Sequence, residues 1–326
     1  MRRRALLLGF TGLTPALAGI ARASAPLAMA TATATANLPR PLRPGSRIAA
    51  VAPGTWLERG DPLLDQLRRR CAAQGWQLQT PQELLGRWRW FSGSDRQRAE
   101  GLAQVWRDPE VDAIFCVGAG WGSARLLEQG WRPPSRPRWC VGFSDCSALL
   151  LAQLASGSLG GIHGWFGGDD AQWLRLVALL QGRPVADLQG QPAQAGIAEG
   201  PLVVTNLTIA TSLIGTPLFP SLNGAVLVLE DTGEAPYRID RQLTQWRLAG
   251  LLREVAGIGL GRFSWARDDI LPGDFSMEEI LLERLSPLGV PIVQGLPLGH
   301  GRPNLALPLG RRARLDGSRG SLSLLT

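Results

Sequence analysis

Lysine is absent from the sequence, and histidine occurs only twice, as His163 and His300. The missing lysine excludes a Walker A phosphate loop, a Schiff-base enzyme and a Ser-Lys hydrolase, because each depends on a lysine side chain. Two histidines are too few for a three-histidine zinc site, and the sequence contains no H-E-x-x-H motif. We therefore expect neither a catalytic metal nor a cofactor.

Cysteine is scarce as well, and the spacing of the four cysteines includes no C-x-x-C pair that would indicate a zinc ribbon. Three of them lie in or beside apolar runs that are typical of strands or of a helix start. The four are Cys71, Cys116, Cys140 and Cys146. We expect buried free thiols, and a disulfide remains the alternative if the protein is exported.

The basic charge comes entirely from 34 arginines, which give a formal net charge of +7 and a pI near 10.6. Basic residues are clustered on nucleic-acid-binding surfaces. The arginines of this sequence are scattered instead, and their tightest runs are Arg2–Arg4 and Arg68–Arg70. A high-GC coding bias explains arginine in place of lysine, so we expect no nucleic-acid partner. With 45% hydrophobic and 19% charged residues among 326, the chain is typical of a globular protein with one large or two modest domains.

Residues 1–45 have the pattern of a signal peptide followed by a flexible leader. Arg2–Arg4 precede an uncharged stretch at 5–21, and Ala21-Arg22-Ala23 resembles a cleavage site. Paired arginines before a weakly apolar stretch favour a twin-arginine signal, and Pro15 with several glycines disfavours a membrane-spanning helix. We expect a periplasmic or otherwise exported protein without stable membrane insertion. The alternative is an uncleaved tail on a cytoplasmic protein.

From residue 46 onward, short apolar runs alternate with segments of helical spacing. Strands are expected at 48–52, 75–78, 111–117, 139–143 and 226–229, and helices at 65–73, 94–106, 147–154 and 239–252. Strands separated by helices form right-handed βαβ units, so residues 46–180 are predicted to form a domain with a parallel sheet. The Gly-, Pro-, Gln- and Ala-rich stretch at 181–198 is predicted to be a linker, and residues 199–326 a second, α+β domain.

A glycine-rich turn follows the expected strand at 111–117. Its sequence, Gly118-Ala119-Gly120-Trp121-Gly122-Ser123, is similar to a dinucleotide-binding fingerprint. The third glycine comes too early, however, and no acidic residue follows about 20 positions later, as that fingerprint requires. A tight turn that exposes backbone N–H groups is the simpler interpretation.

A strand that stops at a serine just before a helix is typical of a nucleophile elbow. The segment Val141-Gly142-Phe143-Ser144-Asp145-Cys146-Ser147 has this form, with Gly142 two residues before the serine where the chain must turn sharply. Cys146 replaces the final glycine of G-x-S-x-G. On these residues alone, a helix N-cap at Ser144 or Asp145 is therefore the simpler explanation.

A nucleophilic serine needs a base, and the base needs an orienting carboxylate. Both histidines lie in glycine-containing segments at predicted strand ends, so the residues alone do not choose between His163 and His300. The apolar strand at 226–229 delivers Glu230 at its end, where functional residues often lie. A capping role for Glu230 in the next element is the alternative.

A series of short motifs, in order along the chain from roughly residue 46 to residue 310, resembles the LD-carboxypeptidases. This family of serine peptidases also includes the microcin C self-immunity peptidases. The motifs are FSGSD (91–95), RA (98–99), DPEVDAI (108–114), GWGSARLL (120–127), GFSD (142–145), HG (163–164), NL (206–207), GTP (215–217), LED (229–231), EAPYRID (234–240) and GH (299–300).

The resemblance implies a Rossmann-like N-terminal domain and a smaller α+β C-terminal domain, with the site at their interface. It implies that Ser144 is the nucleophile, His300 the base and Glu230 the orienting carboxylate. For the oxyanion of the tetrahedral intermediate, we expect the backbone N–H groups of Gly120 and Asp145 to be the donors. The implied reaction is hydrolysis of an L,D-amide bond, with release of terminal D-alanine from murein tetrapeptides.

The sequence departs from the family in segments that shape the pocket. The family's G-G-Y-G turn is Ala119-Gly120-Trp121-Gly122 here, His-Gly-Pro is His163-Gly164-Trp165, and G-G-N-L is Val204-Thr205-Asn206-Leu207. These changes leave the triad intact, so the substrate is the open point. The alternatives are an amidase of the microcin-immunity type that acts on aminoacyl-nucleotide conjugates, and a non-catalytic two-domain binding protein. The expected partner is a murein peptide, and the oligomeric state stays open, a homodimer included.

Overall fold

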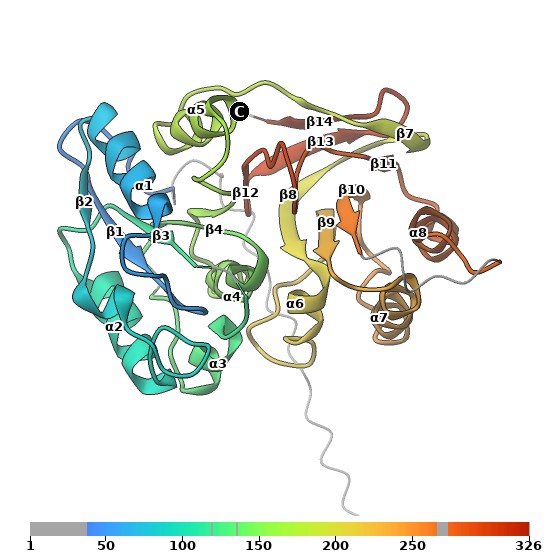
Figure 1. Ribbon diagram of the computed structural model, residues 1–326. Coiled ribbons are helices and arrows are strands. Elements are labelled where there is room, and N and C mark those ends of the chain that lie inside the picture. The colour runs from blue at the N-terminus through green and yellow to red at the C-terminus, as the bar shows by residue number, and fades with distance from the viewer. Residues whose placement is uncertain (1–37, 119, 135, 266–272, 326) are drawn as a thin grey trace, which may run out of the picture. The chain divides into compact units, whose positions relative to one another are not determined.

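A parallel sheet organises the N-terminal half of the chain in the computed structural model, which describes residues 38–118, 120–134, 136–265 and 273–325 (Figure 1). Its strands are β1 (Arg47–Val51), β2 (Gln77–Gln79), β3 (Ala113–Cys116), β4 (Trp139–Gly142), β5 (Gly161–His163) and β12 (Leu307–Pro308). They lie in the order β12-β5-β4-β3-β1-β2, and only β12 runs antiparallel to its neighbour. The predicted parallel sheet is confirmed. The expected signal peptide lies outside the described residues.

Helices connect the strands of this sheet, as the alternating pattern predicts. They are α1 (Pro62–Ala73), α2 (Asp95–Arg107), α3 (Ser123–Glu128), α4 (Ser147–Ala155) and α5 (Asp170–Leu180). Local signals set their starts: the Asp61 carboxylate accepts a hydrogen bond from the Leu63 N–H, and Ser94 and Gln97 form a capping box before α2. The helix α5 was not among the predicted elements.

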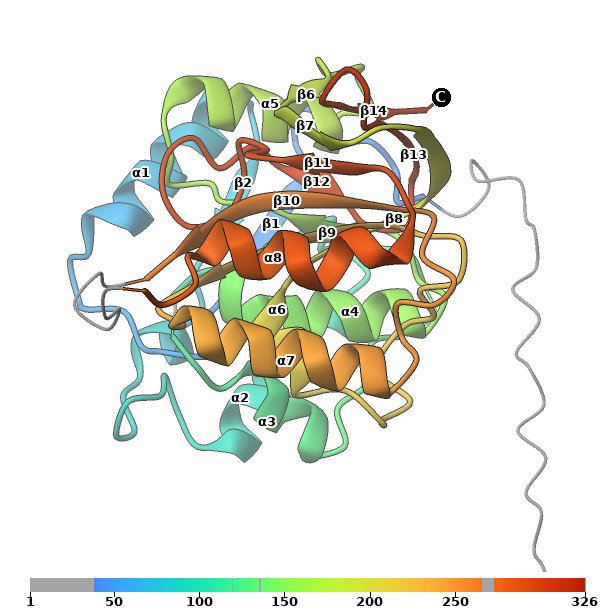
Figure 2. The same cartoon turned by 90° about the vertical axis from the view of Figure 1, so that its right-hand side faces the viewer.

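The second sheet is mixed and is built from the C-terminal half of the chain. Its strands are β6 (Leu188–Gln189), β7 (Gln191–Gln194), β8 (Ile197–Asn206), β9 (Val226–Thr232), β10 (Gly257–Ser264), β11 (Ile292–Gln294), β13 (Arg312–Asp316) and β14 (Ser321–Leu324). The order is β6-β14-β13-β8-β9-β10-β11-β7, in which β8 to β11 are parallel and the outer pairs antiparallel. Three helices, α6 (Leu207–Thr211), α7 (Pro236–Leu248) and α8 (Met277–Leu285), accompany it, and α7 lies beside α8 (Figure 2). The α+β prediction for this half is confirmed.

The segment 181–198, predicted to be a linker, belongs to the second sheet. It contains β6 and β7, which lie at the two ends of that sheet, and the first residues of β8. Its glycines and prolines punctuate very short strands, and each strand pairs with a segment more than 90 residues away in the sequence. Composition alone therefore could not distinguish these strands from a linker.

The two sheets share one apolar core around α4. Residues 147–153 of this helix are all buried, which is typical of a helix surrounded by protein on every side. The helix contacts β5 and β4 of the first sheet and α6 and β8 of the second. In addition, the Asn206 N–H at the end of β8 donates to the Ser147 hydroxyl at the start of α4, at 3.2 Å. The residues just before α4 are thereby held against the second sheet.

The four cysteines are buried and free, as expected.

Within the described ranges, the helices are all too short or too polar to cross a membrane.

Candidate active site

The turn after β4 holds Ser144 in a left-handed backbone conformation, with φ of 57°. Residues other than glycine rarely adopt this backbone conformation, and holding one in it costs about 1–3 kcal/mol. The strand ends at Gly142, Ser144 begins the short 3₁₀ helix η2 (Ser144–Cys146), and α4 follows at once. Neither η2 nor α4 has a side-chain N-cap hydrogen bond. The N-cap explanation is therefore wrong, and the turn has the geometry of a nucleophile elbow.

Ser144, His300 and Glu230 are linked by hydrogen bonds. The Nε2 atom of His300 lies 3.0 Å from the Ser144 Oγ, and its Nδ1 atom lies 2.7 Å from the Glu230 Oε2. These residues are separated by 156 and 70 positions along the chain. The structure thus brings together all three residues predicted from the sequence, and it places His300 rather than His163 beside Ser144.

The loop between β11 and β12 carries His300 from the second sheet to the first. The His300 N–H donates to Glu230 Oε2 at 3.2 Å, and the Arg262 guanidinium donates to the carbonyl oxygens of His300 and Arg302 at 3.1 and 3.2 Å. Gly299 has φ of 95°, and a Cβ there would lie 2.8 Å from the Glu230 Cβ. Glycine is therefore required where the loop passes over the carboxylate.

Glu230 is fully buried in β9, two residues before the end of that strand. Burial by itself raises the pKa of this carboxyl, but the imidazoles of His163 and His300 more than offset that effect and lower it to about 2. Glu230 is therefore ionised at neutral pH and accepts the Nδ1–H of His300. In that tautomer, the Nε2 lone pair of His300 faces the Ser144 hydroxyl, as a general base requires.

The two residues predicted to bind the oxyanion lie in neighbouring turns. Asp145 is the second residue of η2, and Gly120 lies in the turn between β3 and α3. Because β3 and β4 are adjacent and parallel, both turns lie at the carboxyl edge of the first sheet. The Asp145 carboxylate joins them, since it accepts hydrogen bonds from the N–H groups of Gly122 and Ser123 at 3.1 and 2.9 Å.

The side-chain role of Asp145 was not predicted. Its carboxylate also accepts the Ser123 hydroxyl at 2.7 Å and caps the start of α3. Burial raises the pKa of Asp145, and the hydrogen bonds from Ser123 and Gly122 counteract this. The signal was the acidic residue beside the nucleophile, but its partner lies 22 residues earlier and cannot be inferred from spacing.

Aromatic rings pack beside His300. The Phe143 ring lies 4.9 Å from the His300 ring and 5.6 Å from the Trp165 ring, measured between centroids. Neither aromatic residue was singled out from the sequence, although Trp165 occupies one of the positions where the chain departs from the family pattern. The sequence therefore departs from the family pattern at a ring that packs close to His300.

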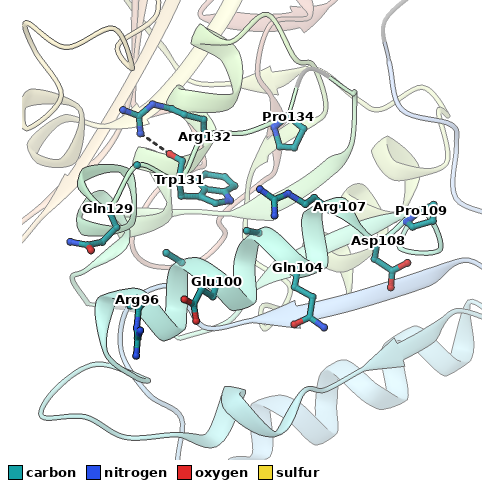
Figure 3. A pocket seen from close by; sticks show the side chains of 13 residues that line it. Arg96, Glu100, Gln104, Arg107, Asp108, Pro109, Gln129, Trp131, Arg132 and Pro134 are labelled. Atoms are coloured by element: carbon teal, nitrogen blue, oxygen red, sulfur yellow. Dashed lines mark hydrogen bonds between the residues drawn. The ribbon is translucent and has the colours of Figure 1, made fainter.

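Two surface hollows flank α2, away from the hydrogen-bonded triad. One, of about 1100 Å³, lies between α2 and the segment after α3 (Figure 3). The other, of about 870 Å³, lies between α2 and residues 79–88. Neither is lined by Ser144, Glu230 or His300. Among the residues that the structure describes, no group of three or more His, Cys, Asp and Glu side chains is arranged to hold a metal ion. The triad geometry, rather than the size of a hollow, defines the candidate site.

Comparisons with known proteins find one family in both sequence and structure. A family model of the LD-carboxypeptidase N-terminal domain matches residues 48–164, and one of the C-terminal domain matches residues 199–315. A putative carboxypeptidase of Synechocystis sp. is 42% identical, over 88% of this chain and 97% of its own length. The murein tetrapeptide carboxypeptidase of Pseudomonas aeruginosa is 31% identical, over 84% of this chain and 94% of its own. The crystal structure of muramoyltetrapeptide carboxypeptidase from Oxalobacter formigenes is similar with a TM-score of 0.72 and 25% identity, over 86% of this chain and 98% of that one.

Proposed function

The chain belongs to the LD-carboxypeptidase family and is a serine-type carboxypeptidase, and we propose that it releases terminal D-alanine from murein tetrapeptides. The bond cleaved is the L,D-amide that precedes the D-alanine. One observation above all supports the catalytic part of this proposal. Ser144, His300 and Glu230 form a hydrogen-bonded series, with distances of 3.0 and 2.7 Å, at a strained nucleophile elbow.

The mechanism is acyl transfer to Ser144. As its Oγ attacks the peptide carbonyl, the Nε2 atom of His300 accepts the hydroxyl proton, and Glu230 stabilises the resulting imidazolium. The tetrahedral oxyanion accepts hydrogen bonds from the backbone N–H groups of Asp145 and Gly120. His300 then protonates the departing amine of D-alanine. A water molecule hydrolyses the acyl-enzyme by the same sequence of proton transfers.

The substrate assignment is supported by the names of two relatives, murein tetrapeptide carboxypeptidase and muramoyltetrapeptide carboxypeptidase. Trp165 is a reason for the substrate to differ from that of these relatives. Its ring lies 5.6 Å from the ring of Phe143, which packs against His300. A bulky ring at this position changes the pocket wall without touching the hydrogen bonds of the triad. The substrate therefore has to be tested separately from the mechanism.

The decisive experiment incubates the purified protein with a defined murein tetrapeptide and measures free D-alanine. The control peptide has the same sequence but ends in L-alanine. Release of D-alanine from the first peptide, with no L-alanine released from the second when L-alanine is measured in the same way, supports the proposal. A third reaction contains an aminoacyl-nucleotide conjugate. Hydrolysis of that conjugate, with no release from the tetrapeptide, would reject murein as the substrate while leaving the serine mechanism in place.

Export to the periplasm is part of the proposal. It is supported by the arginine cluster Arg2–Arg4 and the weakly apolar stretch at 5–21, which together have the pattern of a twin-arginine signal. A periplasmic enzyme would lie close to the source of its substrate. The first described strand begins only at Arg47, so removal of this segment leaves the sheet intact.

A further inference from the structure

The imidazole of His163 is completely buried, and yet it has no hydrogen-bond partner among the described residues. Neither its Nδ1 nor its Nε2 has a partner, and its side chain is 0% exposed. Burying an imidazole without hydrogen bonds is unfavourable, and buried polar groups without a partner usually have a functional or structural reason. The mechanism above gives His163 no role, so its position calls for an explanation.

The ring of His163 is aimed at the carboxylate of the triad. Its Nε2 atom lies 3.7 Å from Glu230 Oε1, which is also buried and without a hydrogen-bond partner. The other oxygen, Oε2, accepts the Nδ1 and the backbone N–H of His300 at 2.7 and 3.2 Å. Each carboxylate oxygen of Glu230 therefore faces a different histidine.

The fold holds His163 firmly in this place. It ends β5, where it pairs with Gly142 of β4 on one side and with Leu307 of β12 on the other. The Phe143 ring packs edge-on against the imidazole, with 6.0 Å between ring centroids. Phe143 directly precedes Ser144. The residues that follow β4 therefore position both Ser144 and the imidazole of His163, which faces Glu230.

We propose that His163 is a positioning residue of the triad: its Nε2–H donates to Glu230 Oε1 and so keeps Oε2 directed at His300. The neutral tautomer with its proton on Nε2 is sufficient, so no additional charge is buried. Catalytic contacts are often long in a protein without substrate and shorten when substrate binds, and the present 3.7 Å separation is of that kind. The inference rests on the proposed triad but not on the identity of the peptide.

His163 does not compete with His300 for the role of base. The Ser144 Oγ lies 3.0 Å from His300 Nε2, whereas neither nitrogen of His163 has any hydrogen-bond partner. His163 thus acts through Glu230, and its loss should slow the chemical step without weakening substrate binding.

The test compares variants that keep or remove the donor. In His163→Gln the side-chain amide nitrogen takes about the place of Nε2, and His163→Met has nearly the same length without a donor. The readout is the rate at which a serine-reactive fluorophosphonate labels Ser144, together with kcat and KM on the peptide. We expect His163→Met to lower the labelling rate and kcat by about 10- to 100-fold with KM within about threefold, and His163→Gln to recover most of the loss.

A control variant and a fallback variant keep this test decisive. Trp106→Phe removes another buried donor without a partner, on α2, and should reduce stability but leave the labelling rate unchanged. If His163→Met does not fold, His163→Asn replaces it, because its amide is too short to reach Glu230. Equal rates for His163→Gln and the donor-deficient variant, or rates equal to the parent for both, would overturn the proposal. Because labelling needs no peptide, a wrong substrate assignment would leave this outcome unaffected.

Discussion

Asp145 accepts both the N–H and the hydroxyl of Ser123, at 2.9 and 2.7 Å, and so ties the nucleophile elbow to the glycine-rich turn. Asp145 follows Ser144 directly, and its own backbone N–H is one of the proposed oxyanion donors. The other proposed donor, Gly120, lies in the turn that this carboxylate holds. The spacing of the two donors therefore depends on a side chain that does not itself contact the reacting carbonyl.

Replacing Asp145 with asparagine should damage catalysis more than binding. The amide group of asparagine offers one acceptor oxygen where the carboxylate serves three donors, so at least one N–H of the glycine-rich turn loses its partner. We expect kcat to fall by about 10- to 100-fold with little change in KM, because an oxyanion donor is displaced. Asp61→Asn alters a similar cap on α1, far along the chain, and should leave kcat unchanged. A rise in KM with kcat unchanged would contradict this role.

Gly142 permits the close approach of the elbow to the strand beside it. An alanine Cβ at this position would lie 2.7 Å from the Cys146 Cβ and 3.1 Å from the Cys116 Cβ. We expect Gly142→Ala to destabilise the protein by about 1–3 kcal/mol, as overpacking of a core does, and to reduce activity. Gly101→Ala, inside α2 with no atom within 4 Å, should instead stabilise by about 0.5–1 kcal/mol. Urea unfolding measures both, and equal stability of Gly142→Ala and the parent would refute the steric argument.

Asp231 should make the protein less stable as the pH rises. Burial raises the pKa of this carboxyl from 3.8 to about 6, although the N–H groups of Thr208 and Thr232 donate to it. Between these two pH values the unfolded chain has lost a proton that the folded chain retains, so stability falls as the pH increases through this window. Asn cannot ionise, and the Tm of Asp231→Asn relative to the parent should therefore rise by about 2–4 °C between pH 4.5 and pH 7.5. A relative Tm that is the same at both pH values would contradict the shifted pKa.

Much of the first sheet follows from local patterns, because apolar runs that alternate with helical spacing specify parallel βαβ units. A serine between a strand and a helix is typical of a nucleophile elbow, but on the residues alone a helix N-cap was the simpler explanation, and the resemblance favoured Ser144 as the nucleophile. The helices α5 and α8 were missed although their signals are present. Asp169 caps α5, and Ser276 with Glu279 forms a capping box before α8.

The arrangement of the two histidines could not be read from the residues. Both lie in glycine-containing segments that the sequence predicts to be strand ends, and only the resemblance favoured His300 as the base. Glu230, which both imidazoles face, lies within β9 of the second sheet, whereas His163 ends β5 of the first. The return of the chain to the first sheet through the two-residue strand β12 has no local signal, because the pairing of Leu307 with His163 is purely tertiary.

The proposed export predicts a shortened N-terminus. Cleavage after Ala21-Arg22-Ala23 would leave a mature chain that begins near Ser24. Fractionation of the native host, followed by N-terminal sequencing, should recover this form from the periplasm. Replacing Arg2 and Arg3 with lysine should retain the precursor in the cytoplasm if the twin-arginine route is used. Recovery of an intact Met1 from the cytoplasm alone would return the enzyme to a cytoplasmic role.

The central claim is that Ser144, with His300 as its base, carries out the hydrolysis. Its most direct test is kcat for Ser144→Ala and His300→Ala on the murein tetrapeptide, with circular dichroism to verify that each variant is folded. Members of a triad act as a unit, so each substitution should lower kcat by at least ~10⁴-fold. A folded Ser144→Ala protein with kcat within about tenfold of the parent would contradict the account, since such a loss is far below that of a missing nucleophile.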